Sequence, residues 1–228
     1  LGITTDTQDA SGRIIQKGDA SGISLGQLET ALDSFSGLIE QTPPMYSALK
    51  YHGQPLYALA RAGITVARKS RPAKIHRLEI IDWQPPVVTI EVECSKGTYI
   101  RSLAHDLGQS LGCGANLKSL IRLRCGIFEI KDAISIPQLE DACHHGYWQN
   151  FVYPMDSVLS HWRATVVNDA TEDAIRNGVS VDLPNLSNSD NTGHLEQYCR
   201  AYNLDGRFLG VLHFNPENGR WHPEKVFS

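Results

Sequence analysis

The sequence has 228 residues, of which 41% are hydrophobic and 20% are charged, a composition typical of a folded globular protein and unlike that of a disordered chain. No apolar run approaches the roughly 20 residues that cross a bilayer, and the first residues lack the basic and apolar segments of a signal peptide. The net charge of −4 conceals an asymmetry, because residues 43–131 carry 13 Lys/Arg and 6 Asp/Glu whereas the remainder carries 8 and 19.

The first part of the sequence predicts two helices on either side of an irregular loop. Ser24 and Gln27 have the spacing of a capping box, and the apolar residues that follow recur with helical spacing up to Gly37, where this helix is expected to end. Residues 41–55 have no regular period and contain prolines and a glycine, so they predict a loop. Residues 56–63 predict a short helix that a glycine ends.

A strand pair and a longer helix come next. Residues 87–95 alternate apolar and polar side chains, as half-buried strands do, and residues 73–83 are expected to pair with them through a short turn. The period then changes to that of a helix over 99–111. Thr98 is its candidate N-cap and Gly112 its C-terminal glycine.

Beyond this helix the sequence alternates between turns and short elements. Residues 112–130 predict a turn, a short helix and a strand. Ser135 is the candidate cap of a helix that ends at Gly146, and residues 169–178 predict another short helix stopped by a glycine. A polar loop at 180–194 and three short strand candidates separated by turns complete the chain.

These elements predict two domains. Residues 1–158 are expected to form an α/β (α+β) body with a mixed, mostly antiparallel sheet and flanking helices. Residues 159–228 are expected to form a small β-barrel-like domain, because the pattern of predicted elements changes near residue 158 and the strand candidates follow it.

The cysteines and histidines argue against disulfides and metal sites. The five cysteines are odd in number and none of them forms a CxxC pair, which indicates reduced thiols in a cytoplasmic protein. The nine histidines form no HExxH motif or Cys/His ladder, so neither a metal nor an organic cofactor is expected. We expect a monomer.

The junction between the last strand and the helix after it, residues 94–108, has the residues of a binding site. Tyr99 and Arg101 would lie on either flank of the apolar stripe of the helix, at its positive end. An arginine and a phenol in this place suit an anion or a carboxylate. The same residues also fit an ordinary surface junction with a solvated arginine, and the local sequence leaves both readings open.

The basic middle of an otherwise acidic chain indicates a surface that faces a polyanion, with nucleic acid favoured over a chance cluster of solvated charges. The positive charge is concentrated in RKSRPAKIHR at 68–77 and KSLIRLR at 118–124. Phosphate contacts position an RNA without reading its sequence. The candidate phosphate-binding residues are Lys50, Arg61, Arg68, Lys69, Arg71, Lys118, Arg122 and Arg124.

Three blocks, taken together, resemble a known family. LGITTDTQDASG, PPMYSALKYHGQPLYALARAG and CSKGTYIRSLAHDLGQSLGCGANLKSLIRLRCGIF are similar in order and spacing to blocks of the bacterial tRNA pseudouridine synthase B family. The resemblance covers nearly the whole chain and weakens in the last seventy residues, which are similar to the PUA-like RNA-binding domain of that family. It implies an isomerase that converts uridine 55 in the T loop of tRNA to pseudouridine.

The resemblance also implies roles for individual residues. Tyr99 matches the tyrosine that contacts the flipped uracil, and Arg101 matches the arginine that pairs with the catalytic aspartate, so both are candidate catalytic residues. The remaining matched positions are candidate substrate-binding residues: Leu120 in the uracil pocket, Lys96 in the same motif, and Tyr46 and Lys50 in the YSAxKxxG loop.

The nucleophile of the family lies in a G-x-L-D-P-x-A-x-G loop upstream of the first block, and no such loop occurs in residues 1–228. Leu32–Asp33 is only superficially similar, because it lies within a predicted helix and lacks the proline. Asp6 and Asp9 are expected to have a structural role in a turn. We therefore expect this chain alone to be inactive.

Pseudouridine formation requires that the base leave its stack, that the N1–C1′ bond break and that C5 join C1′. A carboxylate must attack or stabilise the ribose, or take a proton from it. Arg101 would keep that carboxylate ionised, and Tyr99 would stack on the extruded base. Two other hypotheses remain at this point. One is a tRNA-binding or RNA-folding module without catalysis, and the other is an unrelated α/β protein that would show no salt-dependent RNA affinity.

Overall fold

The computed structural model describes residues 1–186 and 197–227, which form two compact units, Leu1–Ile121 and Arg122–Ser228. Each unit is described by itself. The predicted polar loop at 180–194 lies outside the described residues from 187 onward. Among the described residues no helix is long and apolar enough to cross a membrane.

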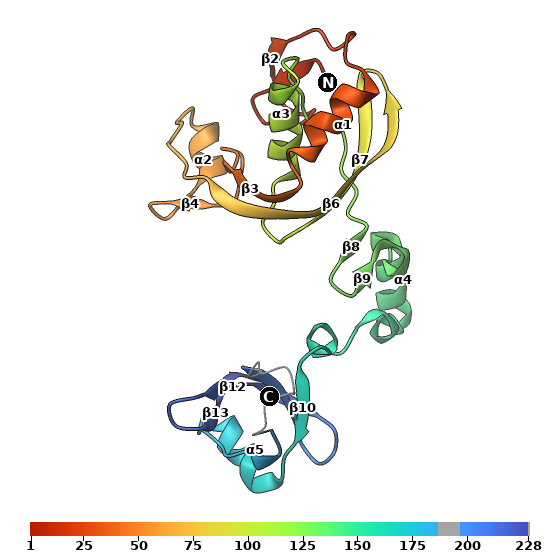
Figure 1. Ribbon diagram of the computed structural model, residues 1–228. Helices are drawn as coiled ribbons and strands as arrows, with labels where there is room; N and C mark the ends of the chain where they lie inside the picture. The colour runs from red at the N-terminus through yellow and green to blue at the C-terminus, as the bar shows by residue number, and fades with distance from the viewer. Residues whose placement is uncertain (187–196, 228) are drawn as a thin grey trace. The chain divides into compact units, whose positions relative to one another are not determined.

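The first unit is built on an antiparallel sheet in the order β3-β6-β7, formed by Gly37–Gln41, Arg71–Gln84 and Val87–Cys94 (Figure 1). The predicted pairing of the two long strands is confirmed, with Ile80 opposite Ile90. Two small strand pairs accompany the sheet: β1 (Ile3–Thr5) with β2 (Ile14–Lys17), and β4 (Lys50–Tyr51) with β5 (Gln54–Pro55).

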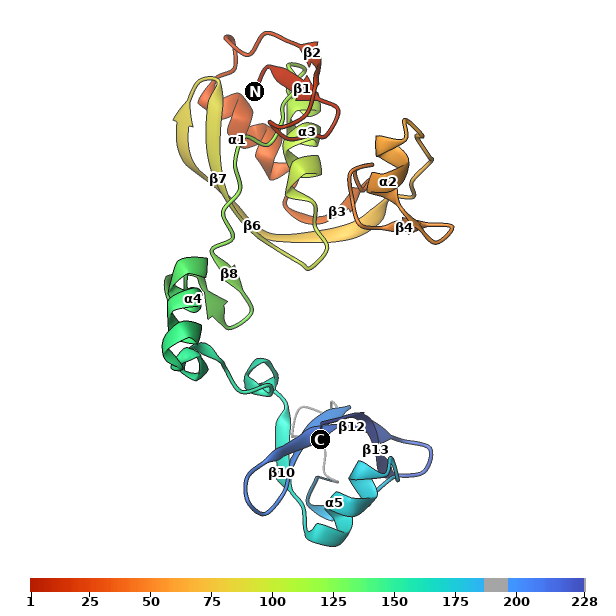
Figure 2. The ribbon, with the colours of Figure 1, turned by 180° about the vertical axis from the view of Figure 1, so that it is seen from behind.

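Three helices complete this unit: α1 (Leu25–Asp33), α2 (Leu56–Arg61) and α3 (Ile100–Ser110). Helices α1 and α3 lie on the same side of the curved sheet, as Figures 1 and 2 show from opposite directions. Leu28, Leu32 and Leu107 form the centre of the core between them, against partly buried side chains of β6 and β7. The apolar stripe of α3 is therefore committed to the core, which leaves its N-terminal flanks for other contacts.

Two helix boundaries differ from the sequence-based expectations. Helix α1 begins with the predicted Ser24 capping box but ends at Asp33, where the backbone N–H of Ser34 bonds to the carbonyl of Ala31 three residues back. Gly37, at φ 83°, instead starts β3. The N-cap of α3 is Tyr99 and not Thr98, whose hydroxyl donates to the carbonyl of Ser95 at 2.9 Å and so belongs to the preceding turn.

The predicted short helix after Gly112 is absent from the described residues. Leu117 instead forms a parallel bridge with Asp9, so this segment is extended. A hairpin of β8 (Arg124–Cys125) and β9 (Phe128–Glu129) follows, then a 3-10 turn η1 (Ile130–Asp132). The close approach of α3 to the extended segment after Gly112 requires glycine at 108, since a Cβ there would lie 2.1 Å from the amide nitrogen of Ala115.

The second unit continues with helix α4 (Ile136–His145), which has the predicted capping box at Ser135 and a left-handed Gly146. Short 3-10 turns η2 (Trp148–Phe151) and η3 (Ser157–Leu159) lead to the last part of the chain. Its elements are β10 (Arg163–Val166), α5 (Asp169–Arg176), η4 (Pro184–Leu186), β11 (Tyr198–Tyr202), β12 (Phe208–Asn215) and β13 (Arg220–Val226).

These strands form one sheet in the order β10-β11-β12-β13, parallel at the first pair and antiparallel at the others. Its core face packs on α5 through Ile175, Leu209 and Leu212, all fully buried. Among the described strands no pairing of β10 with β13 closes a barrel. The expected fold class, α+β with mostly antiparallel sheets and flanking helices, is confirmed.

Candidate active site

The turn after β1 is held in an unusual backbone conformation beside the segment that follows α3. Gln8 has φ 63°, a left-handed conformation that is rare for a non-glycine residue and is frequent at functional sites. The backbone of Leu117 fixes this turn by donating to the carbonyl of Gln8 at 3.0 Å and accepting from the N–H of Ala10 at 2.9 Å. The hydroxyl of Thr5 donates to the carbonyl of Asp9 at 2.6 Å. The position of Asp9 is therefore fixed before its side chain makes any contact.

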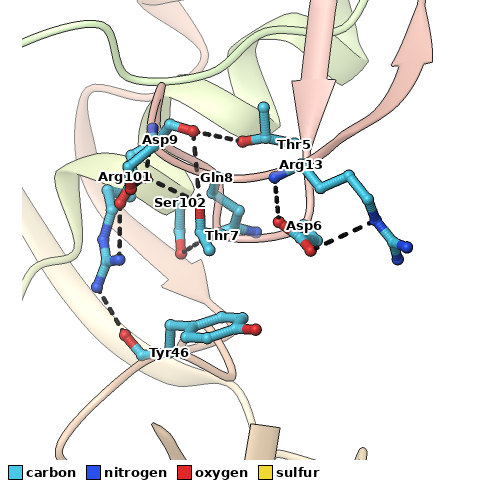
Figure 3. A network of polar contacts seen from close by, with 10 residues as sticks. Thr5, Asp6, Thr7, Gln8, Asp9, Arg13, Tyr46, Arg101 and Ser102 are labelled. Atoms are coloured by element: carbon cyan, nitrogen blue, oxygen red, sulfur yellow. Dashed lines mark hydrogen bonds and ion pairs between the residues drawn. The ribbon is translucent and has the colours of Figure 1, made fainter. Parts of the chain in front are cut away.

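Each carboxylate oxygen of Asp9 accepts hydrogen bonds from a different direction (Figure 3). Oδ1 accepts from the hydroxyl of Thr7 at 2.8 Å, and from the hydroxyl and the backbone N–H of Ser11 at 2.6 and 3.1 Å. Oδ2 accepts from Nη1 of Arg101 at 3.0 Å. Three side chains thus stabilise the ionised form of this one carboxylate.

Arg101, in the first turn of α3, joins two loops that are far apart in the sequence. Its Nη1 binds Asp9 in the N-terminal turn, and its Nη2 donates to the backbone carbonyl of Tyr46 at 2.7 Å. The side chains of Arg101 and Asp9 are only 27% and 24% exposed, so solvent screens the ion pair less than it would a surface pair. The interpretation of Asp9 as a turn residue alone is therefore incomplete, because Asp9 is also the carboxylate partner of Arg101.

Partial burial by itself raises the pKa of the Asp9 carboxyl, but the hydrogen bonds from Ser11, Thr7 and Arg101 outweigh it and hold the pKa below its ordinary value. The carboxylate is therefore ionised at neutral pH. Asp6, in the same turn, accepts from the backbone N–H of Arg13 at 2.9 Å, which is the structural turn role expected for it.

The lowered pKa of Asp9 predicts a specific pH dependence of stability. Ionised Asp9 stabilises the fold above the unfolded-state pKa of about 3.9, and this contribution is lost as the pH falls through the lower folded-state pKa. The replacement Asp9→Asn should reduce the free energy of unfolding at pH 7 by about 1–3 kcal/mol and flatten its decline below about pH 4. Urea unfolding at a series of pH values measures both effects.

Asp33→Asn, at the exposed end of α1, is the matched control and should leave the acid limb of the stability curve as in the wild type. An Asp9→Asn protein whose stability falls with acid in parallel with the wild type would contradict the assignment of this limb to the Arg101 network.

Tyr99 is positioned through its backbone by a residue that the sequence did not single out. Gln41, the last residue of β3 and 3% exposed, accepts from the N–H of Tyr99 at 2.7 Å and donates to its carbonyl at 3.0 Å. A similar buried contact joins Ser102 to Gln8, with the hydroxyl donating to the amide oxygen at 2.9 Å. A glutamine facing the core at a strand end was the available signal, because a buried amide requires partners.

The other predicted site residues lie at different distances from this network. Tyr46 belongs to it through its carbonyl, which accepts from Arg101. In the view of Figure 3, the ring of Tyr46 lies below the turn that contains Thr7. Lys96 is exposed in the turn before α3, Lys50 is exposed in β4, and Leu120 is 61% exposed in the segment after α3. The structure thus brings Tyr46 into contact with Arg101 and leaves the other three on open surface.

The predicted phosphate-binding residues concentrate in one segment. Residues 41–78 contain seven Lys/Arg and no Asp/Glu. Arg61 is exposed on α2 above the ring of Tyr57, whereas Arg68 donates to the carbonyl of Pro43 at 3.1 Å and so helps to hold the loop. The remaining members are exposed, Lys69, Arg71 and Lys118 in the first unit and Arg122 and Arg124 in the second.

Two family models match the chain. The model described as TruB family pseudouridylate synthase (N terminal domain) matches residues 1–100, and the model described as tRNA pseudouridylate synthase B C-terminal domain matches residues 101–160. The matched regions therefore include the Asp9 turn, the basic segment, Arg101 and Leu120.

Curated relatives named tRNA pseudouridine synthase B align over the whole chain. The one from Pseudomonas aeruginosa (strain UCBPP-PA14) is 39% identical over 229 residues, which cover 99% of this chain and 72% of the relative. The one from Dehalococcoides mccartyi (strain ATCC BAA-2266 / KCTC 15142 / 195) is 38% identical over 228 residues, which cover 100% of this chain and 73% of the relative.

Solved structures share the fold at lower identity. A Cbf5-Nop10-Gar1 complex contains a chain with a TM-score of 0.64 and 22% identity, and the match covers 91% of this chain and 63% of that one. An H/ACA RNP bound to a substrate RNA containing 2′-deoxyuridine contains a chain with a TM-score of 0.64 and 19% identity, covering 92% and 63%. This chain therefore spans less than two thirds of those chains, and the likeness concerns the fold.

Proposed function

Because the chain belongs to the TruB family of pseudouridylate synthases, we propose that it forms the larger part of an isomerase that converts uridine 55 in the T loop of tRNA to pseudouridine. The observation that carries this proposal is the network of Asp9, Arg101 and Tyr46 at the start of α3, next to a Tyr99 that Gln41 fixes. The curated relatives named for this reaction class align across these residues.

In this proposal Arg101 positions the nucleophilic carboxylate. A guanidinium has five N–H donors, and the contacts to Asp9 and Tyr46 use two of them. The others can bind the aspartate of the family's G-x-L-D-P-x-A-x-G loop, which residues 1–228 do not contain. Asp9 acts through Arg101: it holds the guanidinium in place and offsets part of its charge, so Asp9 is a positioning residue.

Tyr99 would receive the extruded uracil. It is the N-cap residue of the eleven-residue helix α3, and no side chain caps this end, so the first N–H groups of the helix can stabilise negative charge. The uracil detaches as an anion when the N1–C1′ bond breaks, turns, and forms a bond from C5 to C1′ while the C5 proton leaves. The phenol of Tyr99 can stack on the base and, if it reaches, move that proton.

The basic segment 41–78 would position the tRNA through its phosphates, with the T arm recognised by its shape and its splayed bases. Residues 159–228 would form the PUA-like RNA-binding domain, and residues 1–158 the catalytic domain. The protein would act as a cytoplasmic monomer. It would need no cofactor, since each step uses only side chains and helix dipoles.

One observation favours a second function. Residues 41–78 carry seven Lys/Arg and no Asp/Glu, and this positive charge would bind the T arm without any catalytic group. This second candidate is a tRNA-binding or RNA-folding module, and it makes the same RNA contacts as the enzyme.

Tritium release from a T-arm RNA labelled at uridine C5 separates the two, because the new C5–C1′ bond displaces the label. The assay uses the 228-residue chain and a chimera in which the family's aspartate-containing loop segment precedes Leu1, with RNA binding measured in parallel. We expect both proteins to bind the RNA and only the chimera to release tritium. Binding without release by the chimera would favour the module, and release by the chain alone would place the nucleophile within residues 1–228, with Asp9 the first to replace.

The contacts of Gln41 predict a positioning role in this assay. Gln41→Leu removes both partners of the Tyr99 backbone, which should lower the free energy of unfolding by about 1–3 kcal/mol. In the chimera it should lower kcat while KM for the T-arm RNA stays within about twofold, because the basic segment is unchanged. Gln109→Ala, on the exposed end of α3, is the control. An unchanged kcat in Gln41→Leu would show that Tyr99 does not depend on this clamp.

A further inference from the structure

The last sheet of the chain has one face that its core does not use. Along β11, Cys199 and Ala201 are fully buried against the core, whereas Tyr198, Arg200 and Tyr202 alternate with them and are partly exposed on the opposite, outer face. The sheet register places Tyr198 opposite His213, and His213 opposite His222. The outer face therefore carries a line of rings that crosses three strands.

Trp162, immediately before β10, extends this line. Its ring stacks on Tyr198 with the centroids 5.1 Å apart and the planes 17° from parallel. Tyr198 in turn contacts His213 at 4.9 Å, and His161 contacts Trp162 at 5.5 Å. We call His161, Trp162, Tyr198 and His213 the ring platform. None of its members belongs to the core cluster of this unit, although all are large and partly apolar.

A polar network fixes the position of the ring platform. Arg200 donates to the carbonyl of Trp162 at 3.1 Å and to the hydroxyl of Tyr202 at 3.0 Å, and its Nη1 lies 3.6 Å from Asp156. Tyr202 donates to the same carboxylate, and its partial burial and this hydrogen bond raise the pKa of the phenol, so it keeps its proton. The chain before β10 is thus tied to the sheet, and Trp162 is held in place before any ligand arrives.

The charge of this region decides which ligand fits. Residues 159–228 contain 6 Lys/Arg and 9 Asp/Glu, so they do not offer the dense positive charge that binds duplex phosphates. Aromatic rings bind unpaired bases by stacking, a mode that is tolerant of sequence because every base has a π-face. Bases inside a duplex are not accessible to such rings.

We propose that the ring platform, centred on the Trp162–Tyr198 stack, binds unpaired nucleotides of the RNA outside the T loop. This proposal rests on the proposed function in that it takes the ligand to be RNA. It assigns a second contact to a different part of the chain and a different chemistry, since stacking on rings replaces the phosphate contacts of the basic segment.

The test uses the whole 228-residue chain and a labelled single-stranded RNA hexamer, with a blunt RNA duplex as competitor. Trp162→Ala and Tyr198→Ala should each weaken hexamer binding by about 5- to 150-fold, the range measured for base stacking. Tyr198→Phe should bind as the wild type does, because it keeps the ring, and it also shows that the site tolerates substitution. Trp148→Ala, which removes a tryptophan that is 43% exposed in η2, is the matched control.

The indole N–H signals in NMR spectra add a readout that does not depend on folding of the variants. The hexamer should shift the signal of Trp162 and leave that of Trp148 in place. Hexamer binding that is unchanged in both alanine variants, or a shift confined to Trp148, would overturn the proposal. T-arm binding without hexamer binding would refute the platform and leave the proposed function intact, whereas hexamer binding without T-arm binding would do the reverse.

Discussion

Replacement of Arg101 by methionine is expected to slow tritium release by the chimera by about 10²- to 10³-fold, the usual effect of removing one preorganised charged donor from an active site. The reason lies in its two contacts, 3.0 Å to Asp9 and 2.7 Å to the carbonyl of Tyr46. Without the guanidinium the nucleophilic carboxylate loses the cation that keeps its pKa low, and the Asp9 turn and the Tyr46 loop are no longer joined.

Single-turnover tritium release measures this change free of product dissociation. RNA affinity should fall far less than the rate, because the seven Lys/Arg of residues 41–78 do not include Arg101. Arg13→Met is the matched control, since it removes an arginine outside that segment whose side chain is 84% exposed and lies 4.0 Å from Asp6. A loss of rate no greater in Arg101→Met than in Arg13→Met would refute the positioning role.

Arg101→Lys refines the test. Lysine keeps the charge but has a single nitrogen, so it cannot reach the Asp9 carboxylate and the Tyr46 carbonyl with two separate groups as a guanidinium does. We expect it to restore part of the rate that methionine loses. Full restoration would mean that charge alone matters and that the bridge between the two loops does not.

The elements that the sequence predicted well are those whose signals are local. The capping boxes at Ser24 and Ser135 each involve residues three positions apart, and the long strand pair is joined by a short turn. The resemblance to the family marked Arg101, and the periodicity separately placed this residue at a strand-to-helix junction.

What the sequence did not predict depends on contacts between distant residues. Asp9 and Arg101 are 92 positions apart, and Gln41 and Tyr99 are 58 apart, so no spacing rule connects them. The helix expected after Gly112 failed for the same reason, because the bridge between Asp9 and Leu117 holds that segment extended against its local preference. Non-local pairing thus assembled the site and also overrode the local pattern.

The second large effect is expected at Tyr99. Tyr99→Ala in the chimera should lower kcat/KM for the T-arm RNA by about 5- to 150-fold, because the extruded uracil loses a stacking partner that contributes roughly 1–3 kcal/mol. The fold should tolerate this change, since Gln41 holds Tyr99 through backbone atoms that alanine retains. Tyr153→Ala, at a tyrosine that is 53% exposed in the second unit, is the control.

Tyr99→Phe separates the two roles proposed for this residue. Phenylalanine keeps the ring and removes the hydroxyl, so a purely stacking residue would leave kcat and KM as in the wild type. If the hydroxyl also moves the C5 proton, Tyr99→Phe should lower kcat at unchanged KM and enlarge the isotope effect of the C5 label, because proton loss then limits the rate. Wild-type kcat/KM in Tyr99→Ala would exclude both roles, and the uracil would then have to stack on another ring, with that of Tyr46, beside Arg101, the first to replace.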